Sequence, residues 1–77
     1  MKGIAILGPG CPKCNTLAKN AKQAAEELGI EFQLDKITDI NAITSFGVMM
    51  TPGLVIDGEV KSAGKALSVE EIKKLLQ

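Results

Sequence analysis

The order of apolar and polar residues predicts alternating strands and helices. The run Ile4–Leu7 contains no polar residue, which is typical of a strand that is covered on both faces and lies centrally in its sheet. After two cysteines, apolar residues recur at helical spacing from Leu17 to Leu28, and Gly29 is a stop signal. We therefore expect a central strand followed by a long helix.

The next segment, residues 30–35, alternates apolar and polar side chains and predicts an edge strand with one buried face. Because a strand, a helix and a strand in this order usually form a right-handed crossover, the first two strands are expected to be parallel. A short helix follows, with Thr38 or Asp39 as its cap and its end near Gly47. Its expected apolar positions are Ile40, Ile43 and Phe46.

A hairpin and a final helix complete the chain. Leu54–Ile56 is apolar, the pair Asp57-Gly58 is a turn signal, and the polar segment Glu59–Ala63 predicts a second edge strand. Ser68 and Glu71 then occupy the positions of a capping box that opens a terminal helix. The predicted order is β-α-β-α-β-β-α over one domain, residues 1–77. With the first strand between the second and third, this gives an α/β fold with a four-stranded mixed sheet and helices on both faces.

Composition excludes several kinds of chemistry. The 77 residues include no His, Trp or Tyr, so the chain has no histidine general base, no His-ligated zinc and no usual aromatic platform for nucleic acid. Nine basic and nine acidic residues cancel and are interspersed, so no nucleic-acid partner is expected. No apolar run approaches the length of a membrane span or of a signal peptide's core, and we expect a cytoplasmic protein without a membrane partner.

Two cysteines in the stretch "GPGCPKCNT" are the candidate chemical centre. The spacing Cys11-x-x-Cys14 alone is compatible with a structural disulfide, a soft-metal site or a dithiol that exchanges electrons. A closed zinc site needs about four ligands, which one copy of this chain does not supply as thiol and imidazole. A Cu(I) carrier stays open as an alternative, because soft thiolates suit that ion.

The position of the pair at a helix start favours the redox interpretation. Cys11 is expected at or near the N-cap, Pro12 at the first helical position and Cys14 inside the first turn. Unpaired amides and the helix dipole would then lower the pKa of the Cys11 thiol. Cys14 falls on the inward side of the helix and is expected to be shielded. Cys11 is therefore the candidate nucleophile and Cys14 the resolving thiol.

A Thr51-Pro52 pair stands directly before the hairpin. A strand, a CxxC at a helix start and a proline before a β-hairpin together resemble the thioredoxin and glutaredoxin superfamily over essentially the whole chain. The short length, "GCPKC", "TPG" and "SVEEIKKLL" are similar to its small redox-active disulfide proteins, the glutaredoxin-like thioredoxins of archaea and bacteria. The resemblance implies a minimal thioredoxin-like fold and a thiol-disulfide oxidoreductase without a cofactor or metal.

The resemblance also implies a substrate site. The proline that matches Pro52 is cis and lies beside the active-site sulfurs, and the residue that matches Thr51 binds an extended substrate peptide through its backbone. Gly10, Pro12 and Lys13 around the first cysteine complete the expected substrate contacts. The implied partners are disulfide-containing proteins and an electron donor like thioredoxin reductase, and we expect the chain to act as a monomer.

Two further positions bear on this site. Ala5 stands where thioredoxins have a buried acid, six residues before the first cysteine, so another group or water is expected to take the proton of the resolving thiol. Met49 and Met50 precede Thr51 and either fill the core or form a soft apolar rim for partner surfaces.

Overall fold

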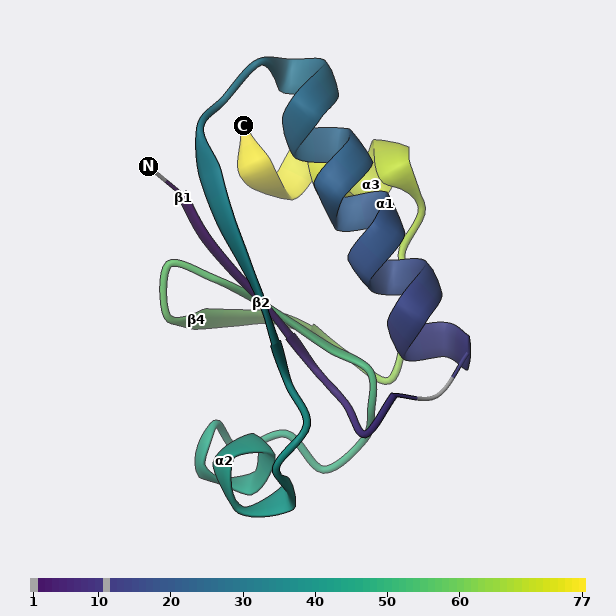
Figure 1. Ribbon diagram of the computed structural model, residues 1–77, viewed down its shortest axis with the longest axis vertical. Coiled ribbons are helices and arrows are strands. Elements are labelled where there is room, and N and C mark those ends of the chain that lie inside the picture. Colours follow the sequence, from purple (N-terminus) through teal and green to yellow (C-terminus); the bar gives the residue numbers. More distant parts are fainter. Residues whose placement is uncertain (1, 11) are drawn as a thin grey trace.

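The computed structural model describes residues 2–10 and 12–77 of the chain. Four strands and three helices follow one another in the predicted order (Figure 1). They are β1 (Lys2–Leu7), α1 (Pro12–Leu28), β2 (Phe32–Ile37), α2 (Ile40–Ser45), β3 (Gly53–Ile56), β4 (Glu59–Ala63) and α3 (Val69–Leu76).

The strands form one mixed sheet in the order β2-β1-β3-β4. β1 is parallel to β2 and antiparallel to β3, and β4 is antiparallel to β3. The first strand therefore lies between the second and third, as predicted. The two segments that were predicted to be edge strands, β2 and β4, lie at the two edges of the sheet. One row of paired residues crosses the sheet at the end of β1 and joins Ile37, Leu7, Gly53 and Ala63.

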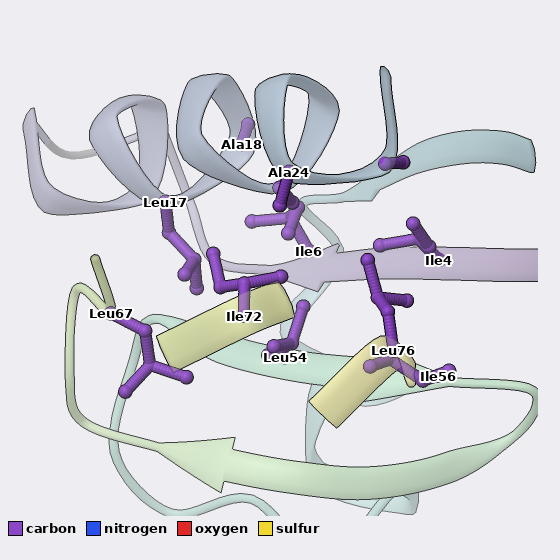
Figure 2. Close-up of a cluster of buried hydrophobic side chains, with 12 residues drawn as sticks. Ile4, Ile6, Leu17, Ala18, Ala24, Leu54, Ile56, Leu67, Ile72 and Leu76 are labelled. Carbon is purple, nitrogen blue, oxygen red and sulfur yellow. The ribbon is translucent and has the colours of Figure 1, made fainter. Parts of the chain in front are cut away.

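Helices cover both faces of the sheet, which confirms the predicted layers. On one face α1 and α3 pack against each other and against the central strands, and Ile6, Leu54 and Ile72 meet in this larger core (Figure 2). On the other face a smaller cluster joins Ile43 of α2 to Leu7, Val48 and Val55. Central strand β3 is buried along its whole length because it contributes to both clusters.

Small side chains let α1 approach the sheet and α3 closely. Four alanines on its inner face are at most 4% exposed: Ala18, Ala21, Ala24 and Ala25. Asn20 on the same helix donates from Nδ2 to the carbonyl oxygen of Leu67 at 2.9 Å, which fastens the segment before α3. At the far end of the two helices, Lys73 of α3 forms an ion pair with Glu27 of α1.

One local expectation was wrong in detail. β2 begins at Phe32 and not at Ile30, because the N–H of Ile30 donates to the carbonyl oxygen of Ala25 at 3.3 Å and completes the end of α1. The predicted short helix is present as α2, and its first residue, Ile40, is 62% exposed. Of the two predicted cap residues, Thr38 and Asp39, it is Asp39 that caps α2, and its carboxylate accepts a hydrogen bond from the N–H of Ala42.

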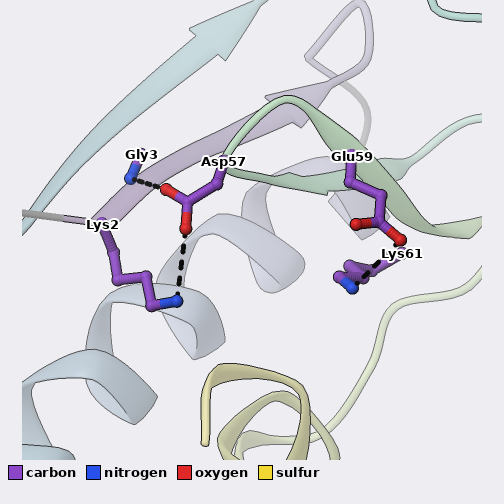
Figure 3. Close-up of polar contacts among 5 residues, drawn as sticks. All are labelled: Lys2, Gly3, Asp57, Glu59 and Lys61. Atoms are coloured by element: carbon purple, nitrogen blue, oxygen red, sulfur yellow. Dashed lines mark hydrogen bonds and ion pairs between the residues drawn. The ribbon is translucent and has the colours of Figure 1, made fainter.

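Asp57 fixes the turn between β3 and β4 to the start of the sheet (Figure 3). Its carboxylate accepts from the N–H of Gly3 at 2.9 Å and from Nζ of Lys2 at 3.2 Å. Both contacts lower the pKa of Asp57 from its ordinary value of 3.8, and the hydrogen bond from the Gly3 N–H has the larger effect.

The predicted capping box of α3 is present too, and hydrogen bonds from Ser68 lower the pKa of Glu71 from its ordinary value of 4.5.

These carboxylates predict a loss of stability in acid. The pKa values of Asp57 and Glu71 are lowered in the folded chain, and that of Glu27 is lowered by its hydrogen bonds from Lys73 and Gln23. A group with a depressed folded pKa stabilises the fold above its unfolded pKa and loses that contribution as pH falls through the folded value. The unfolding midpoint temperature should therefore be nearly constant from pH 7 to 5 and fall below about pH 4.5. A midpoint that rises on acidification would contradict this prediction.

Candidate functional site

The candidate site lies where β1 ends and α1 begins. Pro12 is the first residue of α1, as predicted, and needs no hydrogen-bond partner for its nitrogen there. Gly10 has φ +97°, a left-handed conformation that a residue without a side chain adopts readily. Gly10, Pro12 and Lys13 are all exposed. The predicted position of Cys11 at the N-cap lies outside the described residues.

Cys14 is on the inner face of α1 and is only 4% exposed, which confirms the predicted shielding. It lies against the backbone of Gly8, the first residue after β1. A methyl group in place of the Gly8 hydrogen would collide with Sγ of Cys14 and would lie 3.2 Å from its Cβ. The same methyl would lie 3.7 Å from Cβ of Thr51. Gly8 is therefore the point at which Cys14 and Thr51 meet.

The peptide bond between Thr51 and Pro52 is cis, as the resemblance implied. Pro52 is buried and Thr51 is half-buried. The carbonyl oxygen of Pro52 accepts from the N–H of Gly64 at 2.8 Å, and Gly53 pairs with Leu7. The segment that carries Thr51 and Pro52 is thus held by main-chain contacts on either side, next to the end of β1.

The sheet explains why residues far apart in sequence meet here. Leu7, Gly53 and Ala63 are neighbours in the row of paired residues that crosses the sheet. Each of them is next in sequence to a residue of the site, namely Gly8, Pro52 and Gly64. The N–H of Gly8 also donates to the carbonyl oxygen of Ile37 at 2.9 Å. Strand pairing therefore places Gly8, which contacts Cys14, beside the segment of the cis proline.

Met49 and Met50 lie on the surface, with 88% and 66% of their area exposed. This observation decides against the alternative that they fill the core. Met50 lies over Gly64, since a methyl group at Gly64 would be 3.2 Å from Cβ of Met50. The two flexible thioethers form an apolar rim next to Thr51.

The site has few charged groups, and none of them is buried. The first turn of α1 contains no acidic residue, so nothing there offsets the positive end of this 17-residue helix. Among the described residues, no polar or charged side chain is buried. Ala5, at the place of the thioredoxin acid, packs against the smaller core cluster. The described residues therefore place no buried carboxylate beside Cys14.

Residues 2–10 and 12–77 meet the requirements of neither a metal site nor a membrane-spanning helix. No group of three or more His, Cys, Asp or Glu residues there is arranged to hold a metal ion. No helix in this part of the chain is long and apolar enough to cross a membrane.

Sequence reasoning singled out Cys14 and the Thr51-Pro52 pair, which the structure brings close to each other at Gly8, but it missed the role of Gly8 itself. The signal for Gly8 is its place directly after a buried strand and six residues before Cys14, where a helix packs back onto the sheet. The bond between Gly64 and Pro52 was not predicted either, because it depends on the pairing of β3 with β4.

Comparisons with known proteins agree with this geometry. A family model described as "Thioredoxin domain" matches residues 2–77. A curated protein named thioredoxin from Methanothermobacter thermautotrophicus is 46% identical over 76 residues, which cover 99% of both chains. Another protein named thioredoxin, from Methanocaldococcus jannaschii, is 49% identical over 74 residues, or 96% of this chain and 85% of the relative. The chain belongs to the thioredoxin family.

Proposed function

We propose that this chain is a thiol-disulfide oxidoreductase that exchanges electrons with protein disulfides through Cys11 and Cys14. The observation that carries the proposal is the placement of Cys14, buried against Gly8 and next to Thr51 and the cis proline. A resolving thiol needs such a shielded position one turn inside the helix. The two relatives named thioredoxin support the same class of chemistry.

The proposed reaction has two exchange steps. The thiolate of Cys11 attacks one sulfur of a substrate disulfide, a mixed disulfide forms, and the other substrate sulfur leaves as a thiolate that takes a proton. Cys14, after losing its proton to water or substrate, then attacks Sγ of Cys11 and releases the second substrate thiol. The substrate has gained two electrons and two protons, and the chain holds a Cys11–Cys14 disulfide. A reductase of the thioredoxin-reductase class would return it to the dithiol.

The remaining site residues receive supporting roles in this proposal. The open positive end of α1 would favour the Cys11 thiolate, and exposed Lys13 would add a small, salt-screened contribution. The backbone of Thr51 would bind an extended substrate segment beside Pro52, and exposed Gly10 and Pro12 would border it. Action as a cytoplasmic monomer stays a prediction.

The proposal is tested by equilibrating the protein in buffers of reduced and oxidised dithiothreitol and alkylating the remaining thiols. Mass spectrometry should find a single two-electron couple, and the reduced protein should reduce the disulfides of insulin when a reductant is supplied. Alkylation is the suitable readout because the chain has no Trp or Tyr for intrinsic fluorescence. Failure to reduce any protein disulfide, together with tight stoichiometric binding of Cu(I), would instead support the soft-metal carrier.

The fold gives no support to that alternative. Small heavy-metal-binding domains that carry a CxxC motif, the class to which such a Cu(I) carrier would belong, follow a β-α-β-β-α-β order and end on a strand. This chain has a β-α-β-α-β-β-α order and ends on α3. In the redox proposal the cis proline also has a role, as part of the edge that binds the substrate chain.

A further inference from the structure

A groove that we call the lysine groove runs between edge strand β4 and α3. Its volume of about 400 Å³ is within the range of small-ligand sites. Leu67 and Leu75 contribute apolar surface, and three lysines line it: Lys61, Lys65 and Lys74. The groove therefore offers apolar contacts together with several positive charges.

A β-bulge directs one of these lysines into the groove. Leu54 pairs with Ser62 and Val55 pairs with Val60, which leaves Lys61 as an extra residue in β4. Neighbouring residues of a regular strand point to opposite faces, but Lys61 and Ser62 both line the lysine groove. A bulge also interrupts the edge, so a further strand would pair poorly with β4. The irregularity favours a ligand held by side chains over one added to the sheet.

The charges of the lysine groove are only partly balanced. Lys61 contacts Glu59 at 3.3 Å on its own strand (Figure 3). Glu71, the acidic residue of the groove, accepts a hydrogen bond from the N–H of Ser68 in the capping box, and the nearby charges of Lys65 and Lys74 contribute to lowering its pKa. Within the described chain Lys65 and Lys74 take part in no ion pair. The groove thus has a positive surplus that a negatively charged ligand would meet.

The lysine groove adjoins the candidate site through Lys65. Lys65 directly follows Gly64, whose N–H donates to Pro52 and which also lies under Met50. A substrate chain bound at Thr51 and Pro52 would reach the groove after passing Gly64. Because described side chains around the groove include no aromatic ring, it has no stacking surface for a nucleotide base.

We propose that the lysine groove binds an acidic stretch of a substrate protein, with interspersed apolar residues, that flanks the disulfide being reduced. This inference rests on the proposed function and adds a substrate class to it. Carboxylates of the substrate pair with Lys65 and Lys74, and its apolar side chains cover the half-buried Leu75. Such exposed pairs discriminate among partners and accelerate association, and salt screens them.

The test uses two cyclic disulfide peptides that differ only in a flank of Glu-Leu-Glu-Leu-Glu or Gln-Leu-Gln-Leu-Gln, placed on either side of the disulfide. At low salt, kcat/KM should be about fivefold higher for the acidic peptide in one of the two placements, given the modest contribution of each exposed ion pair. The preference should disappear in 0.5 M salt and in a Lys65→Gln/Lys74→Gln double variant. Reduction of neutral 2-hydroxyethyl disulfide should be unchanged in that variant.

A Lys22→Gln/Lys36→Gln double variant is the matched control. These lysines line a smaller groove of about 250 Å³ against β2, the opposite edge strand, and their removal changes the net charge equally. The control should keep the preference for the acidic peptide. An equal loss in both double variants, or equal rates for both peptides in the unsubstituted protein, would overturn the inference and leave the proposed function intact.

A binding measurement separates the two proposals. A cysteine-free Glu-Leu-Glu-Leu-Glu peptide should shift the backbone amide NMR signals of Lys61, Ser62, Lys65 and Lys74, and the glutamine peptide should not. If the protein reduces none of the disulfides, the proposed function fails while this titration still decides on the lysine groove. Shifts confined to other residues would contradict the inference.

Discussion

A Cys14→Ser variant is expected to accumulate covalent adducts with its substrates, whereas a Cys11→Ser variant should form none. Without the resolving thiol, the bond between Cys11 and a substrate sulfur persists, because no sulfur within the chain attacks it. Without Cys11, the remaining Cys14 is 4% exposed and lies behind Gly8, where a protein disulfide cannot reach it. Both variants should lose steady-state reduction of insulin by at least about 100-fold.

The adducts are measured by acid quenching, alkylation and mass spectrometry after incubation with a cell extract or an oxidised protein. Serine places a hydroxyl in a buried position, which costs about 1–3 kcal/mol when it lacks a partner. Cys14→Ala removes the resolving thiol without that polar group and should trap the same adducts. Trapping by the Cys11→Ser variant alone would mean that the roles of the two cysteines are reversed, and equal trapping by both variants would mean that either cysteine can attack a substrate disulfide.

A Gly8→Ala variant is expected to lower reduction of protein disulfides by at least about tenfold and to destabilise the fold by about 1–3 kcal/mol. The new methyl group collides with Sγ of Cys14 and approaches Thr51. The backbone cannot retreat easily, because the N–H of Gly8 donates to Ile37 and the preceding residue pairs with Gly53. Cys14 must therefore move, and its approach to Cys11 changes.

Gly3→Ala is the matched control, since it makes the same change near the other end of β1. The added methyl there would meet only Oδ1 of Asp57, at 3.8 Å, which is ordinary contact. The control should keep full activity, and chemical denaturation should place its stability within about 0.5 kcal/mol of the starting protein. Unchanged turnover and an unchanged reduction potential in the Gly8→Ala variant would show that Gly8 does not set the position of Cys14.

Local sequence patterns predicted the elements of this fold well, since each pattern depends on neighbouring residues. The apolar run of β1, the Asp57-Gly58 turn and the capping box at Ser68 are all present. The start of β2 was misplaced by two residues because the end of α1 uses the N–H of Ile30.

The candidate site was predictable only in part. Cys14 and Pro52 carry signals in their own neighbourhoods, namely a helix start and a hairpin start. The contact of Gly8 with Thr51 and the bond from Gly64 to Pro52 depend on pairing between strands that are far apart in sequence. The bulge at Lys61 depends likewise on the register of β3 against β4. Composition and spacing do not specify register, so these features required the structure.

Main-chain hydrogen bonds, more than side chains, align the parts of the site. The N–H of Gly8 is tied to Ile37, that of Gly64 is tied to Pro52, and Leu7 and Gly53 are opposite each other in the sheet. Amide groups are the same whichever side chains a chain carries. The surrounding surface can therefore change, with new rims, grooves and charges for new partners, while the backbone arrangement of Gly8, Pro52 and Gly64 is kept.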